Sequence, residues 1–198
     1  MDALDFGPAT ASVAGLVAAV RDDQLAGPTP CPAYSTADLL DHLGGLCVAF
    51  TAAARKVRLP GAEAGPQVDG SRLEDGFRDR IGVALRELAE SWRDPTAYGG
   101  ITQAGPVDLP GEVAALVALN EVVVHGWDLA RATGQAYDPD PVAVAACAGF
   151  VAGFEPPEGA DPDGGLFGPA VAVPDEAPAL DRLIGLTGRD PGWTGSAA

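Results

Sequence analysis

The 198-residue chain is short of basic residues, and that shortage excludes two classes of partner. It has 12 Lys and Arg against 28 Asp and Glu, which gives a formal net charge of −16. Duplex nucleic acid and anionic membrane surfaces both require a basic footprint on the protein that binds them. We therefore expect neither nucleic acid nor a membrane as a partner.

Cysteine is also scarce, with three residues, Cys31, Cys47 and Cys147, and no CxxC pair. An odd count without such a pair argues against a disulfide framework, and reduced thiols are typical of a cytoplasmic protein. We also find no apolar run of the roughly 18 to 20 residues that a membrane span needs. Residues 1–23 have no basic beginning, so they are interpreted as part of an amphipathic first helix and not as a signal peptide.

Apolar residues make up 47% of the chain, enough for one core, so we expect a single domain over residues 1–198. Apolar side chains recur at helical spacing in most of the chain, which predicts an all-α protein. The expected architecture is a four-helix bundle with a short additional C-terminal helix. The predicted elements are helices over 9–24, 35–57, 71–94, 112–133, 140–154 and 177–189, with a short strand in 164–174.

One acidic residue stands out in the most apolar predicted helix, where Glu121 is the only charged residue between Glu112 and Asp128. Positions i and i+4 lie on one face of a helix, so Glu121 and His125 point the same way. His42, the other histidine of the chain, lies on the second predicted helix. Two imidazoles and a carboxylate can hold one divalent metal ion and leave a coordination position open, as catalytic sites do.

Composition and spacing leave other interpretations of these residues open. His125 fits equally an ordinary core histidine, and Glu121 can pair with Arg55 or Arg78, or face solvent. Asp128 can orient His125 or pair with Arg131, and the second is the more usual role for such an acid. No Ser/His/Asp triad, phosphate loop or dinucleotide fingerprint is present, so the catalytic residues stay unknown.

Three further features lie close to these residues in the sequence. Cys31 precedes a helix start, where the dipole can lower a thiol pKa, although an inert thiol is the more common case. Gly126 can let a ligand or another helix approach, and a packing role fits it equally well. Gly44-Gly45 facing Gly126 would open space beside the site. Trp127 is expected in the core.

Two motifs resemble a known family. "TPCPAYSTADLLDHLGG" and "EVVVHGWDLARATGQ" are similar to the two histidine-bearing helices of the DinB-like superfamily. They resemble most its branch related to the N-terminal domain of mycothiol-dependent maleylpyruvate isomerase. The ending "LDRLIGLTGRDPGW" resembles the C-terminal segment of the same branch.

The resemblance implies a four-helix bundle that binds a divalent metal, zinc or nickel, through His42, Glu121 and His125. The spacing of Asp128 to His125 makes it a candidate to stand behind these ligands. It also implies mycothiol as a cofactor. Two departures weaken the transfer of the reaction. The maleylpyruvate isomerases carry a further C-terminal domain that has no counterpart here, and the aromatic residue after "CP" is displaced to Tyr34.

The implied function is a thiol-dependent transferase or isomerase that binds a small-molecule thiol and acts on an electrophilic substrate. The alternative is a non-catalytic metal- or ligand-binding sensor module, and a purely structural helical domain is a third interpretation. The sequence leaves a homodimer open.

Overall fold

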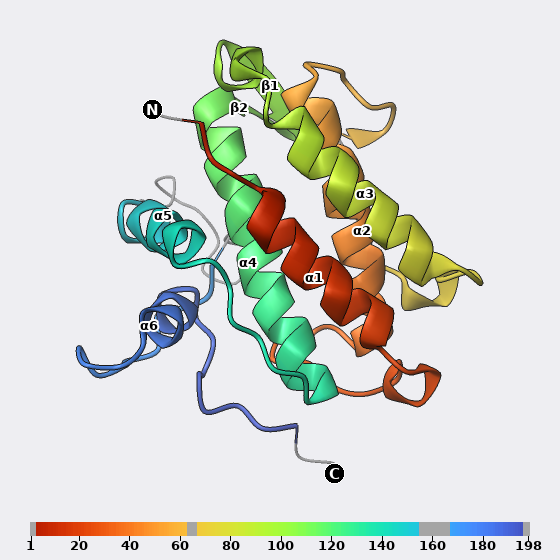
Figure 1. Ribbon diagram of the computed structural model, residues 1–198, viewed down its shortest axis with the longest axis vertical. Helices are drawn as coiled ribbons and strands as arrows, with labels where there is room; N and C mark the ends of the chain where they lie inside the picture. Colours follow the sequence, from red (N-terminus) through yellow and green to blue (C-terminus); the bar gives the residue numbers. More distant parts are fainter. Residues whose placement is uncertain (1–2, 63–66, 155–166, 196–198) are drawn as a thin grey trace.

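The centre of the protein is a bundle of four helices. The computed structural model describes residues 3–62, 67–154 and 167–195. In the bundle, α1 and α4 pack against each other, and each also packs against one of the other two helices, which pair together (Figure 1). The fold is therefore the all-α bundle that the apolar pattern predicts. Its helices are α1 (Gly7–Ala19), α2 (Thr36–Ala54), α3 (Phe77–Ser91) and α4 (Gly111–Thr133).

Smaller elements surround the bundle. Helix α5 (Pro141–Ala152) packs on α4, and α6 (Ala179–Leu186) packs on α5, beside α4 and away from α2 and α3 (Figure 1). An antiparallel hairpin of β1 (Ile101–Ala104) and β2 (Val107–Pro110) joins α3 to α4, with Ile101 opposite Pro110. The 3-10 turns are η1 (Asp22–Gln24), η3 (Gly70–Arg72) and η4 (Pro95–Tyr98).

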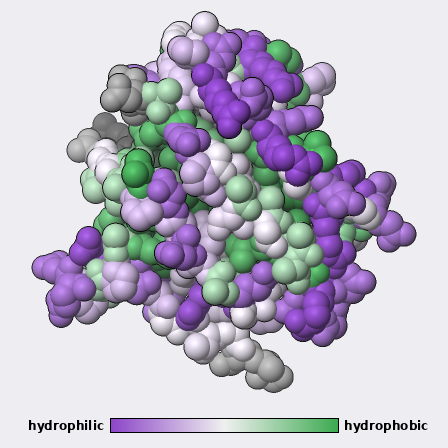
Figure 2. Space-filling model, in the orientation of Figure 1, coloured by the Kyte–Doolittle hydropathy of each residue, from purple (hydrophilic) through white to green (hydrophobic). Residues whose placement is uncertain are grey.

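The apolar stripes of the sequence form the core. Helix α4 is buried along most of its length, because α1 and α2 cover one side and α5 another. On the face drawn in Figure 2, hydrophilic residues dominate the edge formed by α3, and paler residues cover α1. The buried residues at helical spacing in α1, α2 and α3, and next to their ends, include Val13, Leu16, Val17, Val20, Leu39, Leu43, Phe50, Phe77, Ile81, Leu85, Leu88 and Trp92.

The two helices that carry the histidines have well-defined ends. Helix α2 begins with a capping box, in which Ser35 Oγ accepts from the amide of Asp38 and the Asp38 carboxylate accepts from the amide of Ser35. Helix α4 ends at Gly134, which is left-handed with φ 68°. These caps define the start of α2, which carries His42, and the end of α4, which carries Glu121 and His125.

The start of the third helix and the short strand differ from the prediction. The third helix was expected over 71–94 but begins at Phe77, because Gly76 adopts a left-handed φ of 78° and separates it from η3. The strand expected in 164–174 is absent from its described part, residues 167–174. There the amide of Val171 donates to the carbonyl of Gly185 at 2.9 Å and attaches the segment to α6 instead of to a strand.

Helices α2 and α4 are long and apolar enough to cross a membrane by length and composition alone. The expectation that no segment reaches this length is therefore wrong. However, 56% of the apolar window of α2 and 78% of that of α4 is buried inside the bundle. Core helices pass the same test, so the result is weak evidence for a membrane span.

Gly126 of α4 tests the packing of the bundle. A Cβ at this position would lie 2.7 Å from both Val13 Cγ2 and Tyr137 Oη, whereas a Cβ at exposed Gly45 would meet nothing within 4 Å. We expect Gly126→Ala to lower the free energy of unfolding by about 1–3 kcal/mol through overpacking. Gly45→Ala should raise it by up to about 1 kcal/mol through helix propensity. Urea denaturation measures the free energy of unfolding of both variants. An equal increase in the two would contradict the close packing at Gly126.

Candidate metal centre

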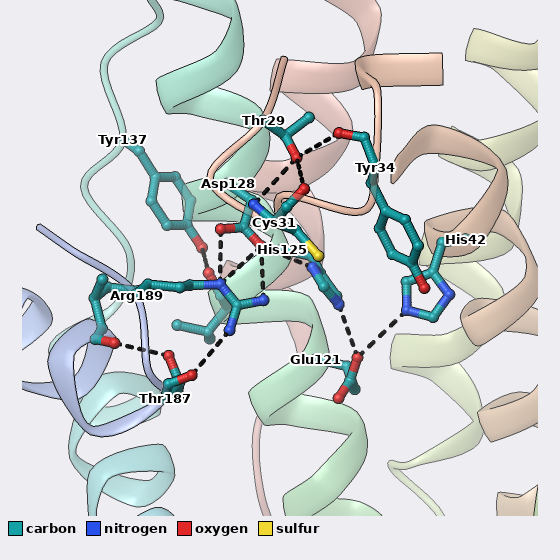
Figure 3. A network of polar contacts seen from close by, with 12 residues as sticks. Thr29, Cys31, Tyr34, His42, Glu121, His125, Asp128, Tyr137, Thr187 and Arg189 are labelled. Atoms are coloured by element: carbon teal, nitrogen blue, oxygen red, sulfur yellow. Dashed lines mark hydrogen bonds and ion pairs between the residues drawn. The ribbon is translucent and has the colours of Figure 1, made fainter. Parts of the chain in front are cut away.

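His42, Glu121 and His125 converge between α2 and α4 (Figure 3). Each offers one ligand atom, and no two of these atoms are more than 4.8 Å apart. Glu121 Oε2 lies 3.0 Å from His125 Nε2 and 3.8 Å from His42 Nε2. The predicted one-turn spacing on α4 thus places Glu121 and His125 together, and the packing of α2 against α4 adds His42.

The donor set fits a divalent metal ion. Donors about 2.0–2.1 Å from a zinc ion lie about 3.3 Å from one another in a tetrahedral arrangement, close to the two separations at Glu121 Oε2. The rings of His42 and His125 are nearly perpendicular, at 88°, with centroids 4.9 Å apart. The three side chains keep only 8–12% exposure, so an ion held by them would be almost dry.

His125 lies between two carboxylates. Its Nδ1 is 2.9 Å from Asp128 Oδ2, and its Nε2 faces Glu121. An ionised carboxylate only accepts hydrogen bonds, so Nδ1 carries a proton, and a second proton or a metal ion must stand between Nε2 and Glu121. Burial lowers the pKa of His125, but the hydrogen bonds to Asp128 and Glu121 outweigh burial and raise the pKa to about 9.

The two acids respond to their surroundings in the same way. Burial raises the pKa of Glu121, but hydrogen bonds from His125 and His42 outweigh it and hold the pKa well below its usual range. Burial also raises the pKa of Asp128, and His125 and Arg189 reverse that effect. Both carboxylates are therefore ionised in a site that holds little water, which favours a cation beside them.

The alternatives for the acids are resolved by their contacts. Arg78 is engaged elsewhere, with the carbonyl of Val20 and with Asp22. Within the described residues, Glu121 forms ion pairs with the two histidines and with neither Arg55 nor Arg78.

Asp128 orients His125, one of its two expected uses, but the pairing of Asp128 with Arg131 is wrong. Arg131 turns outward and donates to the carbonyl of Trp193 at 3.2 Å. The partner of Asp128 is Arg189, whose Nε donates to Oδ1 at 2.8 Å and whose Nη2 donates to Oδ2 at 2.9 Å. Sequence reasoning missed Arg189, which lies 61 residues away.

Gly44 and Gly126 were expected to face each other and open space beside the site, but they do not. The space at Gly126 is filled by Val13 and Tyr137, while a Cβ at Gly44 would contact Ile81 of α3 at 3.5 Å. Gly126 therefore serves close packing, and Gly44 and Gly126 face different neighbours. Trp127 is in the core, as predicted.

The loop before α2 covers the histidines. The ring of Tyr34 lies 5.4 Å from that of His42, centroid to centroid. The thiol of Cys31 is partly buried, within the electrostatic influence of Arg189, Asp128 and Glu121. Burial raises the pKa of Cys31 despite the opposing charge of Arg189, so the lowered pKa considered for a helix start is not found.

The chain is similar in sequence to a known family and to two mycobacterial proteins. Residues 6–130, which include all three converging side chains, match the model of the mycothiol maleylpyruvate isomerase N-terminal domain. The chain belongs to this family. Two uncharacterised proteins of Mycobacterium tuberculosis, from strains CDC 1551 / Oshkosh and ATCC 25618 / H37Rv, are each 30% identical over 176 residues. The match covers 89% of this chain and 91% of each relative.

The crystal structure of the mycothiol-dependent maleylpyruvate isomerase has a similar fold, with a TM-score of 0.53 at 15% identity. The match covers 72% of this chain and 65% of that one, so this family member spans about two thirds of the isomerase chain. At this identity the likeness shows the DinB-like bundle fold and does not transfer the reaction.

The three thiols of this family member should react slowly in the folded protein. Burial raises the pKa of Cys47 and of Cys147 to about 12, and it raises that of Cys31 above its ordinary value. With iodoacetamide at pH 7.5 we expect slow alkylation of Cys31, faster as the pH rises, and protection of the other two. Mass spectrometry of the native and urea-unfolded protein measures this. Alkylation of native Cys31 faster than that of a small thiol at pH 7 would contradict a raised pKa for Cys31.

Proposed function

We propose that His42 and His125, each through Nε2, and the carboxylate of Glu121 hold one divalent metal ion, zinc or nickel. The observation that carries this proposal is the convergence of three buried donors within 4.8 Å, one of them a carboxylate that needs a cation. Asp128 supports the set because it accepts from Nδ1 of His125 and so turns Nε2 toward the ligand position. A carboxylate behind a ligating histidine is a recurrent feature of metal sites.

We further propose that the centre serves a mycothiol-dependent transferase or isomerase that acts on a small electrophile. A divalent cation lowers the pKa of a thiol that coordinates it. The surrounding charges support an anionic ligand. With the ion and neutral imidazoles in place, Glu121, Asp128 and Arg189 leave the centre with one net positive charge, which a thiolate neutralises. Family membership supports mycothiol as that thiol, and residues 1–198 are proposed to act as one domain.

The first test is metal content. Tag-free protein should contain about one zinc or nickel ion per chain by elemental analysis. His125→Ala should lose most of the affinity, because two protein ligands are too few for a stable site. Glu121→Gln should weaken binding strongly, whereas Glu112→Gln, which removes the same charge from the exposed start of α4, should not.

Stability provides a second readout of the same proposal. Most of the core lies in apolar stripes away from the centre, so metal-free protein should still unfold cooperatively. Zinc at 100 times its Kd should stabilise the fold by about 2.7 kcal/mol, seen as a rise in Tm. Folded protein that neither contains nor takes up zinc or nickel would refute the metal site.

The second test concerns the thiol. Isothermal titration of mycothiol and glutathione into zinc-loaded protein, in two buffers of different ionisation enthalpy, measures binding and proton release together. We expect mycothiol to bind with release of about one proton, because a metal takes a thiol as thiolate. Metal-free protein and Glu121→Gln are the controls and should bind little. Zinc-loaded protein that binds neither thiol would favour the non-catalytic sensor module.

A further inference from the structure

The carboxylate of Asp128 is fully buried and is held from two sides. His125 donates Nδ1–H to Oδ2 at 2.9 Å. Arg189 donates Nε–H to Oδ1 at 2.8 Å and Nη2–H to Oδ2 at 2.9 Å (Figure 3). The side chain of Asp128 has no exposed area, and that of Arg189 keeps 15%. A planar guanidinium that binds both oxygens fixes the plane of a carboxylate, which a single point charge does not do.

The end of α6 brings Arg189 to this position. Gly188, which follows the capping residue of α6, adopts a left-handed φ of 82°, and the amide of Arg189 donates to the carbonyl of Ile184 at 3.2 Å. This is the geometry of a glycine-terminated helix, and it turns the chain back toward α4. Trp193 then packs against the cluster formed by Val124 and Trp127 of α4 and Ile184 of α6. The region that matches the family model ends at residue 130, so Arg189 reaches the centre from outside it.

A second arginine fastens the same segment to α4 without touching Asp128. Arg131 donates to the carbonyl oxygens of Trp193 and Pro191, at 3.2 Å and 3.3 Å. Arg131 is exposed, and its guanidinium lies 5.7 Å from the centroid of the Trp127 ring. The two arginines therefore share the task of attaching the segment, but only Arg189 reaches the carboxylate behind His125.

We propose that Arg189 is a positioning residue of the candidate metal centre. It fixes the carboxylate of Asp128, and Asp128 in turn holds His125 with Nδ1 protonated and Nε2 directed at Glu121. The inference rests on the proposed metal binding and adds a role for the C-terminal segment. Changes to groups behind a ligating histidine typically alter metal affinity about 10- to 100-fold. Arg189 acts one contact further out than Asp128, so its effect should lie at the lower end of that range.

The test compares zinc affinities, measured by competition with a chromophoric chelator, in tag-free variants. Arg189→Met keeps much of the side-chain volume and removes the guanidinium, and we expect the Kd to rise about 10-fold. Arg189→Lys keeps the charge but cannot bind both oxygens as a fork, so its Kd should fall between those of the wild type and Arg189→Met. If Arg189→Met does not fold, by circular dichroism, Arg189→Lys alone decides. Arg131→Met is the matched control and should bind zinc like the wild type.

A double-variant cycle separates positioning from general loosening of the fold. Asp128→Asn alone should weaken zinc binding about 10- to 100-fold. If Arg189 acts through Asp128, adding Arg189→Met to Asp128→Asn should weaken binding no further. A double variant whose loss equals the product of the two single losses would overturn the proposal.

Nuclear magnetic resonance gives a readout that does not depend on affinity. The chain has two imidazoles, so the His125 signals of zinc-loaded wild-type protein can be assigned by through-bond correlation to the His125 backbone. In the wild type we expect a hydrogen-bonded Nδ1 proton on His125, and in Arg189→Met or Arg189→Lys a shifted or broadened one. Wild-type affinity together with an unchanged Nδ1 proton in the Arg189 variants would overturn this inference and leave the metal site standing. Wild-type protein that takes no zinc would overturn both.

Discussion

The 3.0 Å contact between Glu121 Oε2 and His125 Nε2 constrains the rest of the centre. Both side chains are nearly dry, and a buried unpaired carboxylate costs about 3–5 kcal/mol. The other nitrogen of the same ring already faces Asp128, so the ring alone cannot serve both acids as a neutral group. A cation, either a proton or a metal ion, has to stand between Glu121 and His125. The second histidine, His42, lies where a metal ion would find its third ligand.

The groups around this contact come from increasingly distant parts of the sequence. Glu121, His125 and Asp128 belong to two turns of one helix, so backbone geometry alone brings them together. His42 comes from α2, and its height along the bundle follows from the capping box at Ser35. Arg189 comes from the segment after α6 and neutralises the buried Asp128. In the proposed metal site, groups behind a ligating histidine orient it, and Asp128 and Arg189 stand in that position.

Family membership and electrostatics support the same kind of ligand by separate routes. The family is linked to mycothiol, and the surroundings of the proposed ion favour an anion. The protein's own thiols do not supply that anion easily. Cys47 and Cys147 are buried with raised pKa values, and burial also raises the pKa of the nearer Cys31. A small thiol from solution therefore suits the proposed chemistry better than an internal cysteine.

The sequence by itself determined what depends on neighbouring residues. It predicted the helix periodicity and the shared face of Glu121 and His125, because each is set within one or two helical turns. The start of the third helix was missed because φ at Gly76 is a backbone choice that the apolar pattern does not encode.

Only the tertiary structure decided which distant groups meet. By spacing, Arg131 was the expected partner of Asp128, yet it turns outward, and Arg189 takes its place. Gly126 could leave space or serve packing, and its close contacts with Val13 and Tyr137 select packing. The sequence grouped His42 with Glu121 and His125 as the other histidine of the chain and through family resemblance. The packing of α2 on α4 brings their ligand atoms within 4.8 Å of one another. Such contacts depend on how whole helices pack, because burial and close packing, not local spacing, select the partners of a buried charge.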